Sequence, residues 1–372
     1  MPHSHVTGHF APAILLASAI LSSAASAAPA APAPEPTPLP ITHVRKHAGA
    51  PPVVVVVAQG EAVLSDFVVP YGVLAQSGAA KVIALNVGDG PLKAGPVTVL
   101  PDMTVAEFDR QYPEGADYVI VPATADKHAE ELQWLRAQRS HGAAMVSICD
   151  GVELLAEIGA LDGRKATGHW ASLPGRQKDF PHVEWRTNVR YVADGDVASS
   201  AGVSASLPIS LALVETIAGP QVALATARRL GVTSWGAGHD SDVFKLRPAD
   251  YAVHTANMRL KRNEVVAVDA RPGDDEVALS LHAEAWSRTM RDQVRLISDE
   301  GGPVRLRGGL RVQTNAARSV KPDVRLSLAE AAPAGSALSG DLDQIAKRYG
   351  AGTARLAALG VEYPWGDLKA AR

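Results

Sequence analysis

Short, continuous runs of β-branched and other apolar residues recur in the first part of the chain, and segments with helical spacing separate them. The runs lie at residues 53–58, 82–85, 118–121 and 143–148. A strand that is apolar at every position is typical of a parallel sheet buried on both faces. Strands that alternate with helices therefore predict an α/β fold with a mostly parallel sheet covered by helices on both sides.

The N-terminal residues have the pattern of an export signal rather than of a folded element. An apolar run at 10–21 is followed by small residues and by Ala25-Ser26-Ala27, which predicts a signal peptide over 1–27. Residues 28–50 are rich in Ala and Pro and predict an extended linker. We therefore expect a periplasmic or secreted protein. The apolar run is too short for a stable membrane insertion.

The remaining chain divides into an α/β domain over 51–245 and an extension over 246–372. The extension contains a degenerate repeat as one interpretation, since a shift of 212 residues places 53–54, 82–85 and 90–91 on 265–266, 294–297 and 302–303. The alternative is that two generic β-α-β pieces align by chance. No second cysteine follows, and residues 341–361 predict a terminal helix.

Charge and cysteine content narrow the functional classes. The net charge is −3, which gives no electrostatic reason to expect nucleic-acid binding. The histidines are scattered, and no phosphate-binding or dinucleotide-binding loop is present, so we expect no metal and no cofactor. One cysteine excludes an intramolecular disulfide. A lone thiol in an exported protein is either buried and inert or kept for its reactivity.

That cysteine, Cys149, follows the apolar strand at 143–148 and precedes Gly151 and a helix. A sharp strand-to-helix turn exposes a nucleophile at the carboxyl end of a sheet, where open α/β proteins bind ligands. The helix N-terminus, with the amides of Asp150 and Gly151, would favour a thiolate and bind a developing anion. The alternative is a small, inert buried side chain.

The residues around this turn resemble one known family. The segments SICDG (147–151) and LLAEIGALDGRKATGHW (154–170) are similar to the ThiJ/PfpI superfamily, in particular to its branch of isonitrile hydratases and sensor domains of AraC-type regulators. The later segment SAGVSA (200–205) resembles the family's Gly-rich motif. The likeness covers about residues 50–235. It implies a flavodoxin-like three-layer α/β sandwich, as in class I glutamine amidotransferases, followed here by a C-terminal α/β extension.

The resemblance also implies roles for single residues. Asp66, four residues before Pro70, stands where the family carries an acid that approaches the cysteine, and His169 is a candidate to orient or deprotonate the thiol. Ala123 and Thr124 replace two glycines that usually supply oxyanion-binding amides, and Gly202 belongs to the later motif. Asp150 departs from the family pattern, because a carboxylate beside the thiol would raise its pKa.

Three functions are consistent with these residues. The first is a cofactor-free cysteine hydratase or hydrolase of small electrophiles, such as an isonitrile or an aldehyde like methylglyoxal. The second is a ligand-binding or sensor protein without catalysis, and the third is a thiol redox sensor. In each case the expected partner is a small molecule, and a homodimer is compatible with the family.

Overall fold

The computed structural model describes residues 38–46, 49–259, 264–366 and 368. These residues belong to one compact unit, Pro34–Arg372. The predicted signal peptide and most of the predicted linker lie outside the described residues. None of the helices within the described ranges has both the length and the apolar character needed to cross a membrane.

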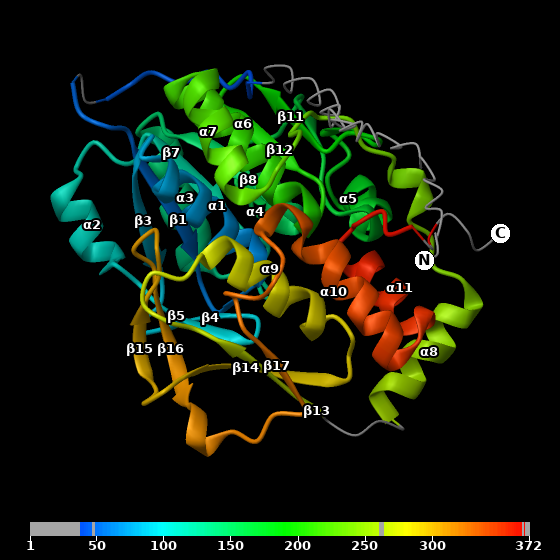
Figure 1. Cartoon of the computed structure of the whole chain (residues 1–372). Coiled ribbons are helices and arrows are strands. Elements are labelled where there is room, and N and C mark those ends of the chain that lie inside the picture. Colours follow the sequence, from blue (N-terminus) through cyan, green and yellow to red (C-terminus); the bar gives the residue numbers. More distant parts are fainter. Residues whose placement is uncertain (1–37, 47–48, 260–263, 367, 369–372) are drawn as a thin grey trace, which may run out of the picture. The chain divides into compact units, whose positions relative to one another are not determined.

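A seven-stranded sheet forms the centre of the first half (Figure 1). Its strands, in order across the sheet, are β11 (Tyr191–Asp194), β12 (Val197–Ser200), β8 (Ala144–Ser147), β7 (Tyr118–Val121), β1 (Val53–Ala58), β3 (Lys81–Asn86) and β6 (Met103–Thr104). All neighbours are parallel except β11 and β12. The carboxyl ends of the parallel strands therefore meet at one edge.

Alternate residues of β1 pack into two separate hydrophobic cores. Val54 and Val56 lie in the core shared with α1 (Leu64–Ser77), α6 (Ser206–Ala218) and α7 (Pro220–Leu230). Val53, Val55 and Val57 lie in the core shared with α2 (Val105–Gln111), α3 (Ala129–Ser140) and α4 (Val152–Glu157). Helices thus cover both faces, and the predicted three-layer α/β sandwich with a mostly parallel sheet is confirmed.

A second sheet combines strands from both halves of the chain. Its order is β17 (Val324–Leu326), β13 (Glu264–Asp269), β14 (Asp292–Ser298), β16 (Arg311–Ala316), β5 (Val97–Leu100), β4 (Leu92–Ala94) and β2 (Glu61–Ala62), with β15 (Gly302–Arg305) paired to β16. The two halves meet where β16 runs antiparallel to β5. The extension is therefore continuous with the first half through backbone hydrogen bonds.

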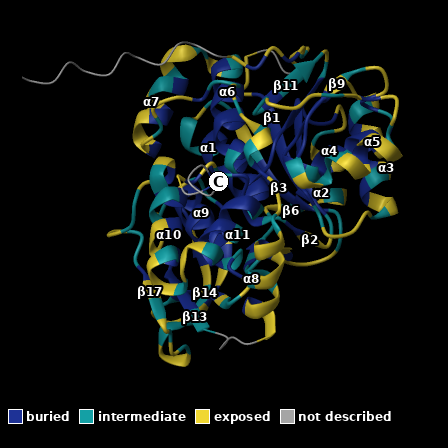
Figure 2. Cartoon of the chain, turned by 90° about the vertical axis from the view of Figure 1, so that its right-hand side faces the viewer, coloured by how far each residue is buried: buried dark blue, intermediate teal, exposed yellow. Residues whose placement is uncertain are grey.

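Four helices complete the second half: α8 (Pro248–Arg259), α9 (Glu276–Ser287), α10 (Ala334–Tyr349) and α11 (Ala351–Gly360). Figure 2 shows α1, α9 and α11 as largely buried elements in the middle of the unit. α9 packs against α1, and its residues from Glu276 to Trp286 are all buried. This helix brings the second half next to the predicted acid on α1.

One predicted helix is wrong in its bounds. Residues 341–361 are not a single helix, because α10 ends before Gly350 and α11 begins after it. Gly350 has φ 88°, a left-handed value that glycine adopts without steric cost and that interrupts a right-handed helix. The apolar spacing persists across the break, so spacing alone did not reveal it.

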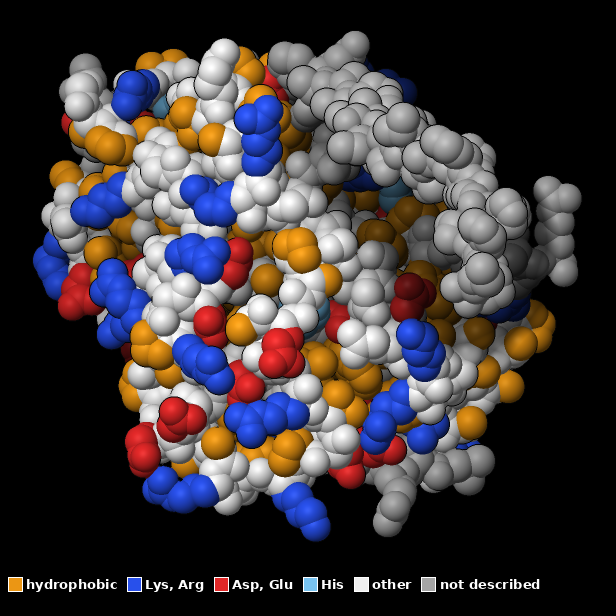
Figure 3. Space-filling view, viewed as in Figure 1, with side chains coloured by type: hydrophobic (Ala, Val, Ile, Leu, Met, Phe, Trp, Pro, Cys, Tyr) orange, Lys and Arg blue, Asp and Glu red, His pale blue; other side chains and the backbone are white. Residues whose placement is uncertain are grey.

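The smaller elements are a two-stranded sheet of β9 (Lys165–Ala166) and β10 (Glu184–Trp185), and the helix α5 (Leu173–Asp179). On the face shown in Figure 3, described Lys and Arg side chains are interspersed with Asp and Glu across the lower part. This part of the surface therefore has no broad field of one sign.

Candidate functional site

Cys149 occupies a strained turn between strand and helix. β8 ends at Ser147, Cys149 opens a single 3₁₀ turn, and α4 follows from Val152. The φ of Cys149 is 55°, in the left-handed region that costs an L-residue roughly 1–2 kcal/mol. The Cys149 N–H donates to the Ala201 carbonyl at 3.1 Å and holds the turn against the loop after β12. Strain of this kind is often found at functional residues.

Gly151 is required by the close approach of the loop after β7. A Cβ at this position would lie 2.2 Å from the Val121 carbonyl oxygen and 2.8 Å from the Pro122 carbonyl carbon. Both obstacles are backbone atoms, which cannot rotate away as a side chain can. The glycine therefore lets the β7 loop pass directly beside the turn that carries Cys149.

The thiol of Cys149 is buried, and its surroundings disfavour the thiolate. Burial raises the pKa of this thiol well above its usual range, and the charges of Asp66, Asp150 and Glu362 raise it further. The Asp150 N–H, hydrogen-bonded to the sulfur, acts in the opposite direction. The expectation that the helix N-terminus would leave a thiolate is therefore wrong for the free protein, because desolvation outweighs the amide.

Asp66 lies in the first turn of α1 and is completely buried. Its Oδ2 accepts a hydrogen bond from the Ala123 N–H at 3.4 Å, and its Oδ1 has no partner among the described residues. Burial raises the pKa of this carboxyl well above its usual range, and the neighbouring Glu284 charge adds to the rise. A buried carboxyl with a raised pKa and an unpaired oxygen can donate or accept a proton near neutral pH.

The second half supplies an ion pair beside these two groups. From α9, Glu284 Oε2 accepts hydrogen bonds from the Ser65 N–H at 3.1 Å and the Ser65 hydroxyl at 3.3 Å. Arg288 Nε donates to Glu284 Oε1 at 2.7 Å. The charge of Glu284 raises the pKa of Arg288, and negative charge on Cys149 and Asp66 adds to the rise. Arg288 is thus a fixed positive charge near the thiol and the acid.

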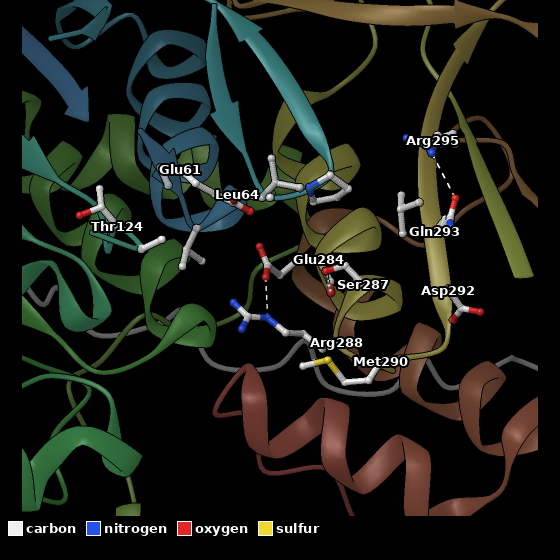
Figure 4. Close-up of a pocket in the computed structure, with 16 residues that line it drawn as sticks. Glu61, Leu64, Thr124, Glu284, Ser287, Arg288, Met290, Asp292, Gln293 and Arg295 are labelled. Atoms are coloured by element: carbon white, nitrogen blue, oxygen red, sulfur yellow. Dashed lines mark hydrogen bonds and ion pairs between the residues drawn. The ribbon is translucent and has the colours of Figure 1, made fainter. Parts of the chain in front are cut away.

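A cavity of about 490 Å³ opens on the outer side of this ion pair (Figure 4). Glu284 of α9 and Arg288, the residue after α9, are joined by their ion pair in this view, and Leu64, the first residue of α1, also lines the cavity. Thr124 and Met290 also line the cavity. Cys149 and Asp66 are not among its lining residues. Arg288 therefore belongs both to the cavity wall and to the electrostatic surroundings of the thiol.

Asp150, the departure from the family pattern, is compensated by a buried cation. Arg176 Nη1 donates to Asp150 Oδ1 at 2.7 Å, and its side chain is only 1% exposed. The guanidinium also lies over the Trp185 ring, 5.2 Å from its centre. Asp150 is therefore a structural anchor for the segment after α4, and its charge is partly neutralised.

His169 lies near the site with one unpaired nitrogen. Its Nδ1 accepts a hydrogen bond from the Ala171 N–H at 3.3 Å, which assigns the proton to Nε2. Nε2 is buried and has no partner within the described part of the chain. Burial lowers the pKa of His169, so the ring is neutral at neutral pH. A neutral imidazole with a free N–H is a hydrogen-bond donor to a bound ligand.

Glu362 reaches this region from the far end of the chain. Its Oε2 accepts hydrogen bonds from the Gly202 N–H at 2.8 Å and the Trp170 N–H at 3.2 Å. Its Oε1 lies 2.9 Å from His239 Nε2. The carboxylate is completely buried, and Glu362 has φ 52°. The C-terminal segment is thereby fixed across the Gly-rich motif.

The predicted oxyanion donors are mostly engaged elsewhere. The N–H groups of Gly151, Ala123 and Gly202 donate to the Ile148 carbonyl, to Asp66 and to Glu362 respectively. The Thr124 hydroxyl donates to the Asp126 carbonyl at the cavity wall. Each of the first three N–H groups thus has an acceptor within the protein in this structure, and their role in anion binding stays a prediction. The Asp150 N–H at the sulfur is the amide that remains in the right place.

Sequence reasoning missed Glu284, Arg288 and Glu362, which all lie beyond residue 245, and the buried cation Arg176. The shift of 212 residues places Glu284 on Gly72, so it gave no signal for an acid at this position. Within the described ranges, no group of three or more His, Cys, Asp or Glu side chains is arranged to hold a metal ion. The neighbouring side chains of His239 and Asp240 instead contact Glu362 and the Asp242 N–H.

Comparison with known proteins agrees with this geometry. The model of the DJ-1/PfpI family matches residues 52–216, which include Asp66, Cys149 and His169. Residues 52–216 of the chain are therefore similar to the DJ-1/PfpI family. The predicted resemblance to the ThiJ/PfpI family is therefore confirmed over this segment, which ends before α9 and Arg288.

Three relatives show the range of this family. The chain is 38% identical over 93 residues to the HTH-type transcriptional regulator CdhR of Pseudomonas aeruginosa, covering 25% of this chain and 27% of the regulator. It is 27% identical over 114 residues to the isonitrile hydratase of Pseudomonas putida, covering 29% and 48%. It is 24% identical over 172 residues to dj-1beta of Drosophila melanogaster, covering 44% and 89%. The crystal structure of DJ-1beta superposes with a TM-score of 0.44 and 23% identity, covering 49% of this chain and 98% of that one.

Proposed function

We propose that this protein is an exported, cofactor-free cysteine hydratase or hydrolase of small electrophiles, with Cys149 as nucleophile and Asp66 as the proton-transferring group. The observation that carries the proposal is a buried thiol in a strained turn, within electrostatic range of a fully buried carboxyl that has an unpaired oxygen. Burial raises the pKa of both groups and thereby favours the protonated form of each.

A protonated pair suits the addition of a thiol to an isonitrile. Cys149 Sγ forms a bond to the terminal carbon of R–NC, and the thiol proton reaches the same carbon through Asp66, which gives a thioimidate, R–N=CH–S. Water then adds to that carbon while Asp66 gives its proton to the imine nitrogen and takes one from the water, which yields R–NH–CH(OH)–S. Collapse breaks the carbon–sulfur bond, returns the proton to sulfur and releases R–NH–CHO. One water is consumed, and no cofactor is needed.

The charges of the site support each step. The Asp150 N–H at the sulfur and the Arg288 guanidinium stabilise negative charge that develops during attack. The free Nε2–H of His169 offers a donor for the substrate nitrogen. Closed burial of the pair keeps bulk water from competing with Asp66 for the proton.

A ligand-binding or sensor protein without catalysis is the second candidate. The observation in its favour is that the 490 Å³ cavity is lined by Arg288 and Thr124 but does not reach Cys149. Relatives named as HTH-type transcriptional regulators match 25% and 23% of the chain. Redox sensing is the weakest of the three, because a buried thiol with a raised pKa is a slow target for oxidants.

Export rests on the sequence alone. The apolar run at 10–21 and the Ala25-Ser26-Ala27 pattern support cleavage after residue 27. Cell fractionation and the N-terminal sequence of the mature protein test this directly. A mature chain that begins at Met1 would contradict it.

The functional test compares turnover of a small alkyl isonitrile and of methylglyoxal by the wild type, Cys149→Ala and Asp66→Asn. The amide introduced by Asp66→Asn keeps the shape of a neutral carboxyl but cannot transfer its proton, so we expect about a 10²- to 10⁴-fold loss in kcat. Asp89→Asn, on an exposed turn, is the matched control and should be unchanged. Tight isonitrile binding by Cys149→Ala, without turnover by the wild type, would favour the sensor instead.

A further inference from the structure

The two halves of the chain repeat one strand register. Val54 of β1 pairs with Val82 of β3, and Val266 of β13 pairs with Val294 of β14, both in parallel. Each residue of the second pair lies 212 positions after its counterpart in the first. Five successive pairs of the first ladder map onto the second in this way, starting from Val53. Two unrelated β-α-β units need not pair their strands in the same register, so the shared register favours a repeat.

A side-chain contact repeats with the strands. Asp117, which precedes β7, accepts a hydrogen bond from the Val53 N–H through Oδ2 at 2.7 Å and donates its own N–H to the Val53 carbonyl at 2.9 Å. Asp323, which precedes β17, makes the same two bonds to Val265, both at 2.9 Å. β17 is therefore the counterpart of β7, with six fewer residues intervening.

The contacts between the two halves are arranged as they would be around a two-fold axis. In the antiparallel pair of β5 and β16, Val99 lies opposite Val312, and Leu100 lies opposite Arg311. The shift of 212 residues relates Val99 to Arg311 and Leu100 to Val312. Each pair is thus the image of the other, which is the defining property of an isologous interface.

The contacts between α1 and α9 show the same two-fold relation with the same shift of 212 residues. Glu284 of α9 is hydrogen-bonded to Ser65 of α1. Conversely, a Cβ on Gly72 of α1 would lie 2.7 Å from Val277 Cγ2 of α9. The shift relates Ser65 to Val277 and Gly72 to Glu284. Strand pair and helix pair therefore share one local two-fold axis.

We propose that residues 264–326 are a second, nucleophile-free copy of residues 53–121 that occupies the position of a partner subunit and supplies Glu284 and Arg288 as positioning residues of the Cys149 site. The axis rests on the contacts above, and the role of the two residues rests on the proposed function. The copies have diverged in complementary ways. Asp66 has Ala278 as its counterpart, while Glu284 and Arg288 have the uncharged Gly72 and Gln76.

The second copy stops before it could form a site of its own. After β17 the chain enters α10, and the sequence contains no second cysteine. The α1 surface that a second molecule would use in a two-fold dimer is covered by α9. A single chain therefore has one complete site, and a homodimer through this face is not required.

The two-fold contact can be tested by cross-linking Thr98 to Gln313, which lie opposite each other across β5 and β16. Thr98→Cys and Gln313→Cys are introduced into full-length Cys149→Ala and treated with a short bismaleimide. Residues directly opposite in an antiparallel pair have Cβ atoms about 5 Å apart. We expect a cross-link within one chain, and no dimer from Thr98→Cys alone. Covalent dimers from the double-cysteine variant or from Thr98→Cys alone would overturn the proposal.

The positioning role is tested by the pH profile of Cys149 alkylation with iodoacetamide in the otherwise native chain. Arg288→Gln removes a positive charge that favours the thiolate, so the profile should move to higher pH, with about tenfold slower alkylation for each pKa unit. Arg288→Lys should restore it. Arg291→Gln, three residues further along and stacked on Tyr349, is the matched control. An unchanged profile in Arg288→Gln would refute the role.

The cross-linking and alkylation experiments distinguish failure of the second-copy proposal from failure of the proposed function. If the wild-type thiol never reacts, the proposed function fails while the cross-link still tests the second copy. If chains cross-link to one another, the second copy fails whatever the activity of Cys149.

Discussion

The left-handed backbone of Cys149 leads to a prediction that reverses the usual order of two substitutions. At most positions Ala is more stable than Gly, by about 0.4–1 kcal/mol, because Gly has the larger conformational entropy in the unfolded chain. At φ 55° an L-residue costs roughly 1–2 kcal/mol that Gly avoids. Cys149→Gly should therefore be more stable than Cys149→Ala by about 1 kcal/mol. This corresponds to a difference in Tm of about 2 °C for a unit of this size.

Urea unfolding followed by tryptophan fluorescence, together with calorimetry, measures this difference. Ala137→Gly, on the exposed side of α3, is the control and should lose about 1 kcal/mol, since its backbone is helical. If Cys149→Ala equals or exceeds Cys149→Gly in the free energy of unfolding, residue 149 does not hold a left-handed conformation. The strained turn would then not exist in solution.

Three further results follow from the structure. Gly151→Ala should lower the free energy of unfolding by about 1–3 kcal/mol through overpacking against Val121, as measured by urea unfolding. Burial disfavours the charged form of His282, but Asp341 and the Ala332 carbonyl raise its pKa overall. The stabilisation from the protonated ring should be full below the unfolded pKa of about 6.5 and should fade as the pH rises through the folded pKa. His282→Asn should lose this pH dependence when the free energy of unfolding is measured at pH 6 and pH 9. Hydrogen peroxide should oxidise Cys149 more slowly than free cysteine at neutral pH, because the pKa of the Cys149 thiol is raised. Faster formation of sulfenic acid, measured by mass spectrometry, would favour the redox-sensor function.

Local patterns in the sequence were sufficient for the first sheet and for the position of the nucleophile. The continuous β-branched run at Val53–Ala58 became the doubly buried β1, and Cys149 lies between β8 and α4 as the strand-to-helix pattern predicts. Asp66 lies in the first turn of α1. These features depend on residues a few positions apart, which is the range over which periodicity is informative.

The electrostatic state of the site could not be predicted in the same way. Helix position alone suggested a lowered pKa for Cys149, whereas the structure buries the thiol beside Asp66 and Glu362. Glu362 and Arg288 approach from more than a hundred residues away in the sequence. Contacts over such separations depend on how the two sheets join, and no local spacing encodes that junction.

The C-terminal half shows the same division. Apolar runs in the sequence predict its helices and strands. They do not predict which face of α9 packs against α1, and that packing decides which residues of α9 reach the site. Glu284 reads in sequence as an ordinary helix acid, and it becomes part of the site only because its carboxylate reaches Ser65. The predicted repeat stays a prediction until the cross-link between Thr98→Cys and Gln313→Cys is measured.

The central claim, that Cys149 adds to a small electrophile with a proton supplied by Asp66, is tested most directly by intact-protein mass spectrometry of rapidly quenched reactions with an alkyl isonitrile. We predict a transient adduct equal in mass to the isonitrile on wild-type protein, located at Cys149 by peptide mapping. Formamide should appear as the adduct decays, and Cys149→Ala should give neither. Formamide produced without an adduct, or produced equally by Cys149→Ala, would contradict the account.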